Sequence, residues 1–270
     1  MSSPSVSTVE PAVSEIPLVD LVAGSGILLP DCAIDHLVRF RDLLHERNQV
    51  VNLTAVREIP AIDRRLVIES LRLVPVLRNL VPEDQEPPVR HLDLGSGGGI
   101  PGMVIAIARP DLSVTLLDAT RKKTDFLADV IRELGLPNAT TLNGRAEELG
   151  HLPRWRNQFD LVTARAVAAL PTILELGAPF LRTGGTMLLP KGTDLDDELV
   201  HAERAAPLLG MEIVSSDPLE DIGSTVETRL VIARKIATTP RTYPRRPGIP
   251  ARSPLGSEPS GRAGRKGSDR

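Results

Sequence analysis

Apolar and polar residues follow two different periods along the chain between residues 89 and 235. Short apolar runs are typical of buried strands, whereas the stretches between them repeat an apolar residue every three or four positions, as one face of a helix does. The pattern predicts strands at 90–94, 113–117, 139–142, 159–163, 186–189, 212–216 and 229–234. It predicts helices at 100–108, 121–134, 146–149, 170–181 and 194–208. This alternation predicts an α/β fold with a mostly parallel, seven-stranded sheet that helices cover on both faces.

Helical spacing alone describes the region before this alternation. It predicts one helix over 31–50 and a second over 61–80, in which Pro75 introduces a kink. An acidic, proline-rich loop then separates these helices from the first strand. We therefore expect a disordered segment over 1–15, a helical cap over 16–88 and an α/β core over 89–236.

Composition narrows the class of protein. The chain has 270 residues, of which 41% are hydrophobic, so it can bury a substantial core, but only 2% are aromatic, which argues against a surface of stacked rings. Cys32 is the single cysteine, which excludes an internal disulfide and a cysteine-based metal cluster. The sequence has neither an apolar run of about 18 residues nor a secretory signal at its start. We expect a cytoplasmic protein without a membrane span or a metal site.

Charge is unevenly distributed. The net charge is −3, yet residues 241–270 hold eight arginines or lysines against Glu258 and Asp269, so the rest of the chain is distinctly acidic. Six prolines lie within 240–259. We expect residues 237–270 to form a disordered, basic, extended tail that suits a phosphate backbone, although a merely solubilising tail stays open.

A glycine-rich turn follows the first strand of the predicted sheet, after Asp93. Gly95, Gly97 and Gly99 fit the D-x-G-x-G-x-G pattern of Rossmann-like methyltransferases, and Gly97, Gly99 and Gly102 fit the G-x-G-x-x-G dinucleotide fingerprint. Glycine lets the backbone approach a ligand closely, and the next helix directs its N–H groups to the same place. The turn predicts a site for an adenosine-containing cofactor, either NAD or S-adenosylmethionine.

Two further segments end neighbouring strands and so reach the same edge of the sheet. Asp118 follows the glycines by about 20 residues, where an acid can accept hydrogen bonds from ribose hydroxyls. The segment 144–148 can meet the amino edge of adenine through an acidic side chain or a backbone amide. A helix-capping acid and an ordinary helix start are the structural alternatives.

Arg165 follows the fourth strand, where methyltransferases place residues that face the methyl acceptor. The chain lacks an Asn/Asp/Ser-Pro-Pro-aromatic element there, and Cys32 lies far away in the cap, so amine and pyrimidine-carbon acceptors are disfavoured. An arginine stays protonated and can fork onto a phosphate or a purine O6. Lys191, after the fifth strand, can reach a phosphate or serve as a turn residue.

Jointly, the motifs resemble one family. They are similar to those of the bacterial 16S rRNA guanine-N7 methyltransferases, also called glucose-inhibited division protein B, over about residues 30–255. The matching segments are 52–57, 91–102, 116–118, 145–148, 165–166, 191–192 and 243–250. Leu66 departs from the family, which commonly has a histidine there, and the extension beyond Leu255 has no clear counterpart.

The resemblance implies a Rossmann-like class I S-adenosylmethionine-dependent methyltransferase. It implies methylation of N7 of a guanine, position 527 in rRNA numbering, in the 530 loop of 16S rRNA in the small ribosomal subunit. We expect the chain to act as a monomer. Together with the glycine turn, the resemblance assigns to the cofactor Asp93, Gly95, Gly97, Gly99, Ile100, Asp118, Ala146, Glu147 and Arg165. It places Asn52, Lys191, Arg245 and Arg246 on the RNA side. From the chemistry of the acceptor, we expect Arg165 to be the catalytic residue that orients the target base or its phosphate.

The expected chemistry agrees with the residues. Guanine N7 carries a lone pair and no proton, so methyl transfer needs alignment and no general base. The alternatives are methylation of another RNA, a protein or a small molecule, a non-catalytic adenosine-binding protein, and an NAD-dependent oxidoreductase, because fold alone does not decide function.

Overall fold

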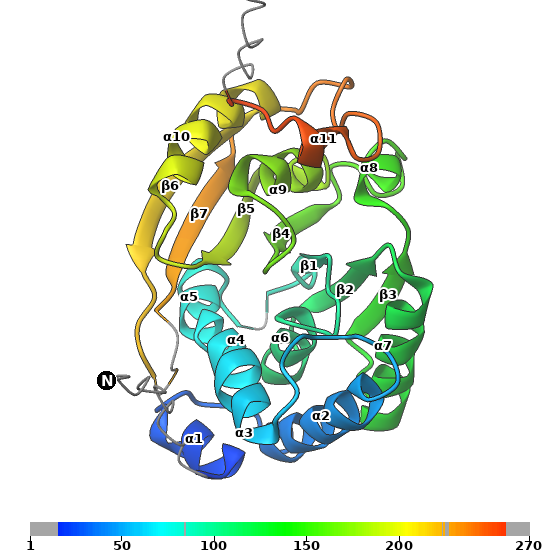
Figure 1. Ribbon diagram of the computed structural model, residues 1–270, viewed down its shortest axis with the longest axis vertical. Helices are drawn as coiled ribbons and strands as arrows, with labels where there is room; N and C mark the ends of the chain where they lie inside the picture. The colour runs from blue at the N-terminus through cyan, green and yellow to red at the C-terminus, as the bar shows by residue number, and fades with distance from the viewer. Residues whose placement is uncertain (1–15, 84, 223, 225–226, 258–270) are drawn as a thin grey trace, which may run out of the picture.

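A seven-stranded sheet forms the centre of the computed structural model, which describes residues 16–83, 85–222, 224 and 227–257 (Figure 1). The strand order is β3-β2-β1-β4-β5-β7-β6, and β7 is antiparallel to both of its neighbours, whereas the first five strands are mutually parallel. The predicted mostly parallel, seven-stranded sheet is confirmed. The strands are β1 (Arg90–Leu94), β2 (Ser113–Asp118), β3 (Ala139–Asn143), β4 (Phe159–Thr163), β5 (Leu181–Lys191), β6 (Met211–Pro218) and β7 (Arg229–Lys235).

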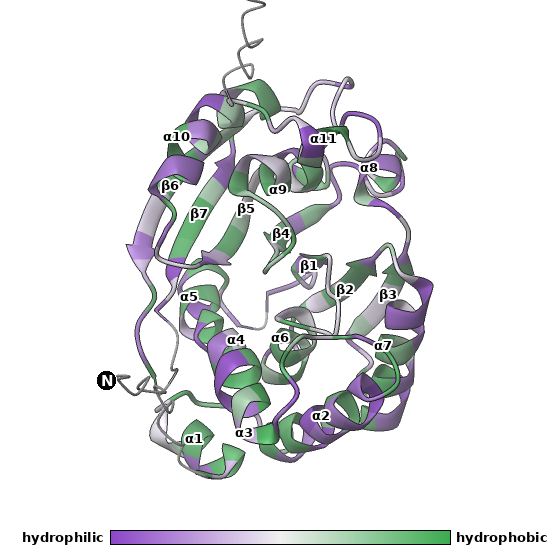
Figure 2. Ribbon diagram, viewed as in Figure 1, coloured by the Kyte–Doolittle hydropathy of each residue, from purple (hydrophilic) through white to green (hydrophobic). Residues whose placement is uncertain are grey.

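Helices cover both faces of the sheet, as its apolar strands require. One face carries α6 (Gly102–Ala108) and α7 (Arg121–Leu134), and the other carries α9 (Leu170–Gly177) and α10 (Asp196–Ala205), with a 3-10 turn over Ala206–Leu209. Figure 2 shows apolar residues along β5 and β7 and polar residues on the outward parts of α7 and α10. No helix within the described ranges is long and apolar enough to cross a membrane.

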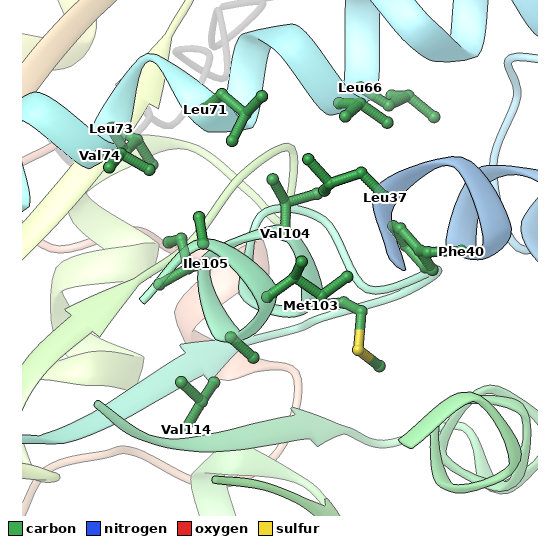
Figure 3. Packing of buried hydrophobic residues seen from close by; sticks show 14 of the residues in the cluster. Leu37, Phe40, Leu66, Leu71, Leu73, Val74, Met103, Val104, Ile105 and Val114 are labelled. Atoms are coloured by element: carbon green, nitrogen blue, oxygen red, sulfur yellow. The ribbon is translucent and has the colours of Figure 1, made fainter. Parts of the chain in front are cut away.

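The N-terminal helices share one apolar core with α6 and α7. Leu37 and Phe40 of α2 and Leu71 of α4 are fully buried against Met103 and Val104 of α6 (Figure 3). The predicted boundary near residue 88 therefore separates segments of the chain but not hydrophobic cores. The cap helices are α1 (Leu18–Gly24), α2 (Ala33–Asn48), α3 (Ile59–Ile62), α4 (Glu69–Leu71) and α5 (Leu73–Leu80).

The second predicted cap helix is divided into several pieces. A π-helical segment covers Asp63–Ile68, and a turn at Arg72 separates α4 from α5. Pro75 explains the second interruption, because it has no N–H to donate to the carbonyl of Leu71. Leu66, which stands where a histidine was expected, lies in the π-helical segment and is buried in the shared core.

Two predicted boundaries in the core were wrong. The helix from Leu170 ends at Gly177 instead of residue 181, because Pro179 has no N–H to donate to the carbonyl four residues earlier. Strand β5 is consequently longer than predicted, and its polar beginning pairs with β4 through Leu181 and Phe159.

The prediction of a disordered tail is wrong for residues 237–257, while 258–270 and the predicted disordered segment 1–15 lie outside the described residues. The described part of the tail packs across α8 (Ala146–Leu149) and α9 and contains α11 (Ile249–Arg252). Arg245 forms an ion pair with Glu175 of α9, whose side chain is fully buried, with Arg245 Nη2 at 2.6 Å from Glu175 Oε2. Composition concealed this packing because the contacts are mainly polar.

We expect Arg245→Met to lower the free energy of unfolding by about 3–5 kcal/mol, because it leaves the buried Glu175 carboxylate without its cation. The double variant Glu175→Gln/Arg245→Met should recover most of this loss, because it removes both charges. Urea unfolding of the full chain measures both values. Arg246→Met, at an exposed neighbour, is the control and should change stability by only about 0.5 kcal/mol. A double variant as unstable as the single one would contradict the assignment.

Candidate active site

The glycine-rich turn lies between β1 and α6, at the edge of the sheet where the parallel strands end. Gly97 has a φ of +56°, a conformation that favours glycine, and its N–H donates to Asp118 Oδ2 at 3.0 Å. The end of β2 therefore fixes the turn that follows β1. Ile100 is half-buried at the far end of the turn and packs against the shared core.

Asp93, at the base of this turn, is fully buried. Its carboxylate accepts hydrogen bonds from the Gly102 N–H at 3.1 Å and from Thr163 Oγ1 at 2.8 Å. A Cβ atom at Gly102 would lie 2.5 Å from Asp93 Oδ2, so only glycine fits there. Asp93 thus joins β1, β4 and α6 beneath the turn instead of facing open space. Burial raises the pKa of Asp93 to about 6, against the favourable bonds from Thr163 and Ser96.

His91 extends this buried network. Its Nε2 lies 2.8 Å from Thr163 Oγ1, whose own proton goes to Asp93. The hydroxyl oxygen therefore accepts, and Nε2 of the imidazole carries the proton. Burial lowers the pKa of His91 to about 3, so the ring is neutral at physiological pH. His91 supports the turn from below and is not placed to act as a base at its surface.

Asp118 ends β2 beside the glycine turn. Its side chain is 8% exposed and accepts from the N–H groups of Gly97 and Thr120, the latter at 2.7 Å. The capping bond that sequence analysis considered as an alternative is therefore present. A carboxylate has about four lone-pair directions, so two remain in principle for ligand hydroxyls.

Asn48 is a site-supporting residue that sequence analysis missed. Its buried side chain accepts from the N–H groups of Leu53 and Thr54 and donates to the Val56 carbonyl. These bonds hold the 52–54 segment over the glycine turn, where the Leu53 carbonyl lies 3.8 Å from the position of a Cβ on Gly97. Asn52, next to Leu53 in this segment, is exposed.

The loop after β4 closes another side of the glycine turn. Val167 lies on Gly95, where an added Cβ would come within 2.7 Å of its Cγ2 atom. Ala166, between Val167 and Arg165, has a φ of +55°, which is uncommon for a residue with a Cβ and costs on the order of 1–3 kcal/mol. The loop is thus held in a strained conformation next to the cofactor turn.

Arg165 is anchored to the cap from this loop. Its Nη2 donates to the carbonyl of Arg65 in the π-helical segment at 2.6 Å. Its Nη1 is buried and has no hydrogen-bond partner within the described part of the chain. Burial lowers the pKa of the guanidinium, and the nearby Glu69 carboxylate acts in the opposite direction. Arg165 therefore presents a desolvated donor with unused hydrogen-bonding capacity.

The other predicted residues are spread around this centre. Lys191 is half-buried and pairs with Glu198 at 2.7 Å, and it also donates to the Ala168 carbonyl. Ala146 is buried at the start of α8, and the next residue, Glu147, accepts a hydrogen bond from the tail. Arg246 is exposed, whereas Arg245 is occupied by Glu175.

The arrangement suits a polar, nucleoside-like ligand rather than a metal ion. Across the described residues, no group of three or more His, Cys, Asp or Glu side chains could hold a metal. The elements available at the edge are a glycine turn, a strand-end carboxylate and a desolvated arginine. Such a set can bind and orient reactants, but it provides no exposed histidine or thiol for proton transfer or nucleophilic attack.

Comparison with known proteins finds similarity to one family. The family described as rRNA small subunit methyltransferase G (GidB) matches residues 33–221. The Ribosomal RNA small subunit methyltransferase G of Roseiflexus castenholzii is 38% identical over 238 residues, which cover 88% of this chain and 98% of that protein. The protein of the same name from Chloroflexus aggregans is 40% identical and covers 88% of this chain and 97% of its own.

Solved structures show the fold. The crystal structure of MtNAS in complex with MTA and tNA has a TM-score of 0.50 at 14% identity, covering 75% of this chain and 74% of that one. The strand order, with antiparallel β7 inserted beside β5, is the Rossmann-like class I arrangement of S-adenosylmethionine-dependent methyltransferases. The predicted fold class is confirmed.

The buried His91–Thr163–Asp93 network predicts two opposing effects of pH on stability. The folded pKa of His91 is below its ordinary value, so its contribution is present above about pH 6.5 and is lost toward pH 3. The folded pKa of Asp93 is above its ordinary value, so its contribution is present below about pH 4 and is lost as pH rises through 6. Each effect has a limiting slope of about 1.4 kcal/mol per pH unit.

Single variants should separate the two effects. In Asp93→Asn the free energy of unfolding should rise steadily with pH between 3 and 6.5, because His91 titrates alone. In His91→Gln it should fall between pH 4 and 6, because Asp93 titrates alone. Denaturant unfolding at half-unit pH steps measures the slopes. Two variants with the same sign of slope would refute the network.

Proposed function

The chain belongs to the rRNA small subunit methyltransferase G family, and we propose that it transfers a methyl group from S-adenosylmethionine to N7 of a guanine in 16S rRNA. We assign this guanine to position 527 in the 530 loop of the small ribosomal subunit, as the sequence resemblance implies. The family membership rests on the matched residues 33–221 and on relatives covered over nearly their whole length. It disfavours the NAD-dependent oxidoreductase.

The observation that carries the proposal is the hydrogen bond between the Gly97 N–H and Asp118. It places a backbone turn and a carboxylate side by side, which is the combination that an adenosine ligand requires. Gly95, Gly97, Gly99 and Ile100 would line the ligand, Asp118 would accept its ribose hydroxyls, and the start of α8 would face its adenine. S-adenosylmethionine, when bound, supplies a methyl group on a positively charged sulfur.

The role of Asp93 in this proposal is to support the turn. Its carboxylate is already occupied by Gly102 and Thr163 and is fully buried. We therefore assign it to positioning the glycine turn, while the half-buried backbone of the turn at Gly95 and Gly97 makes contacts with the donor.

The acceptor atom explains why the site needs no general base. Guanine N7 presents a lone pair and no proton at neutral pH, so no proton has to be removed before the methyl group moves. The chain has only to align the purine with the donor and exclude competing water. The neutral, buried His91 and the lack of an exposed cysteine at the site agree with such a reaction.

We assign the alignment of the acceptor to Arg165. One side of its guanidinium is fixed by the Arg65 carbonyl, and Nη1 is a buried donor without a partner among the described residues. A guanine O6 lies next to N7, and a hydrogen bond donated by Nη1 to O6 would hold the purine while the lone pair of N7 stays free to accept the methyl group. The exposed residues Asn52 and Arg246 would contact the surrounding RNA. Lys191 would do so only by leaving Glu198.

The accessibility of guanine N7 in RNA determines which part of the RNA can be the substrate. The major groove of an RNA helix is deep and narrow, so N7 is reached in unstacked loops rather than in paired helices. We propose that a single copy of the chain acts in the cytoplasm on the small ribosomal subunit or on its RNA.

Replacing Arg165 with Ala should lower the rate of methyl transfer on the order of 100-fold, because the acceptor loses its alignment. Affinity for S-adenosylmethionine should change little by comparison. Incorporation of labelled methyl groups into 16S rRNA measures the rate, and calorimetry measures donor binding. Arg132→Ala, on an exposed part of α7, is the matched control and should retain full activity. Normal turnover in the Arg165 variant would remove its assigned role.

A fragment of 16S rRNA carrying 7-deazaguanosine at the target position should bind but accept no methyl group. The substitution replaces N7 with a C–H group and removes the lone pair while leaving O6 in place. The matched fragment with guanosine should be methylated. Methylation of the deaza substrate would place the reaction on another atom and refute the N7 assignment.

A further inference from the structure

The C-terminal segment 239–250 is held by one side chain after another of the α/β core. Arg156 donates to three of its carbonyls, those of Thr239, Pro240 and Tyr243, at 2.7–3.1 Å. Two further core side chains hold single carbonyls: His151 Nε2 lies 2.8 Å from the Pro244 oxygen, and Thr172 Oγ1 lies 2.9 Å from the Pro250 oxygen. The path of this segment is therefore fixed along its whole length.

Charged side chains also hold segment 239–250 on the core. Glu175, fully buried in α9, accepts from the backbone N–H and from both Nε and Nη2 of Arg245. The Arg156 guanidinium is held by backbone carbonyls, and burial, assisted by Arg241, lowers its pKa. Removing the charges of Glu175 and Arg156 from water is costly. The hydrogen bonds to segment 239–250 offset that cost only when the segment is packed on the core. The guanidinium groups of Arg156 and Arg245 therefore stabilise the fold.

The docked segment contacts α8 at both ends. At the start of the helix, the Gly248 N–H donates to Glu147 Oε1 at 3.1 Å. At its end, Pro244 packs so closely on Gly150 that an added Cβ would lie 3.0 Å from the proline Cγ. Arg156 also donates to the Gly150 carbonyl at 2.7 Å. A helix of one turn is not stable by itself, so its position depends on such tertiary contacts.

Helix α8 in turn lies next to the donor side of the site. It follows β3, whose last residue pairs with Asp118, and the Gly144 N–H donates to the Asp118 carbonyl at 3.1 Å. A displacement of α8 would therefore move Ala146 and Glu147 relative to the carboxylate assigned to the ribose. Segment 239–250 contacts α8, and the adenosine part of the ligand would contact the same short helix.

We propose that residues 239–250 form a brace that sets the position of α8 and thereby the affinity for the adenosine part of the donor. Arg156 is the positioning residue on which the brace depends. This inference rests on the proposed function, since it takes S-adenosylmethionine as the ligand. It replaces the expectation that Arg245 contacts RNA, because that guanidinium is held by Glu175.

The experiment measures ligand binding to the full chain by calorimetry without RNA, using S-adenosylmethionine and 5′-methylthioadenosine. The second ligand retains the adenosine and lacks the amino-acid part. Arg156→Met should raise Kd for both ligands about tenfold, the equivalent of losing one charged hydrogen bond. At saturating donor, kcat should approach that of the unmodified protein, so the effect appears in KM for the donor. Arg154→Ala removes an equal charge two residues earlier, from an exposed side chain, and should leave both Kd values unchanged.

Two further variants test the same proposal if Arg156→Met does not fold. Thr172→Val removes one hydroxyl that holds Pro250 and nearly preserves volume, and Glu175→Gln/Arg245→Met removes the ion pair without leaving a buried charge. Both should weaken binding of 5′-methylthioadenosine. Normal donor binding combined with weaker RNA binding in these variants would overturn the brace and restore the tail as an RNA-binding arm. Failure of the unmodified protein to bind S-adenosylmethionine would instead contradict the proposed function itself.

Discussion

A buried carboxylate, that of Asp93, connects the parts of the molecule that form the site. It accepts hydrogen bonds from the first N–H of α6 and from the hydroxyl of Thr163 on β4, and the Thr163 oxygen in turn accepts a hydrogen bond from His91 on β1. Two adjacent strands and the following helix are therefore fixed relative to one another directly under the glycine turn. Burial raises the pKa of the Asp93 carboxyl and lowers the pKa of the His91 imidazole. Burying these two groups is costly, and their hydrogen bonds hold β1, β4 and α6 together.

The glycines of the turn serve different purposes above this joint. Gly97 provides backbone conformation, and Gly102 provides room for Asp93. Gly99 is required by packing, because a Cβ there would lie 3.2 Å from Phe40 of the cap and 2.9 Å from Met103. The cap thus packs against the glycine turn, and its separation from the core in sequence does not correspond to a separation in space. Some glycines of this motif are therefore required by the packing of neighbouring side chains, independently of any ligand.

Periodicity predicted the sheet well because buried strands and amphipathic helices must repeat their apolar residues in step with their geometry. The regions that were mispredicted lack such a signal. Residues 239–250 are held by carbonyl oxygens, which every residue carries, so composition suggested disorder where Arg156 and Glu175 impose order. Asn48 escaped notice because one asparagine in a helical pattern looks like any surface residue. Asp118 and Gly97 were found because the ends of successive parallel strands meet at one edge. The interactions of Arg165 could not be foreseen, because its partner is a backbone carbonyl 100 residues earlier in the chain.

The position of β7 inside the sheet affects how the protein is made. Strand β6 precedes β7 along the chain, yet β6 is bonded to the sheet only through β7. While the chain emerges from the ribosome, β6 has no partner until residues 229–235 have also left the exit tunnel, and during that interval β5 remains an open edge. The last third of the sheet must therefore close in a single late event. Any stop in translation between residues 218 and 229 leaves one edge of β5 open and β6 without a partner strand on either side.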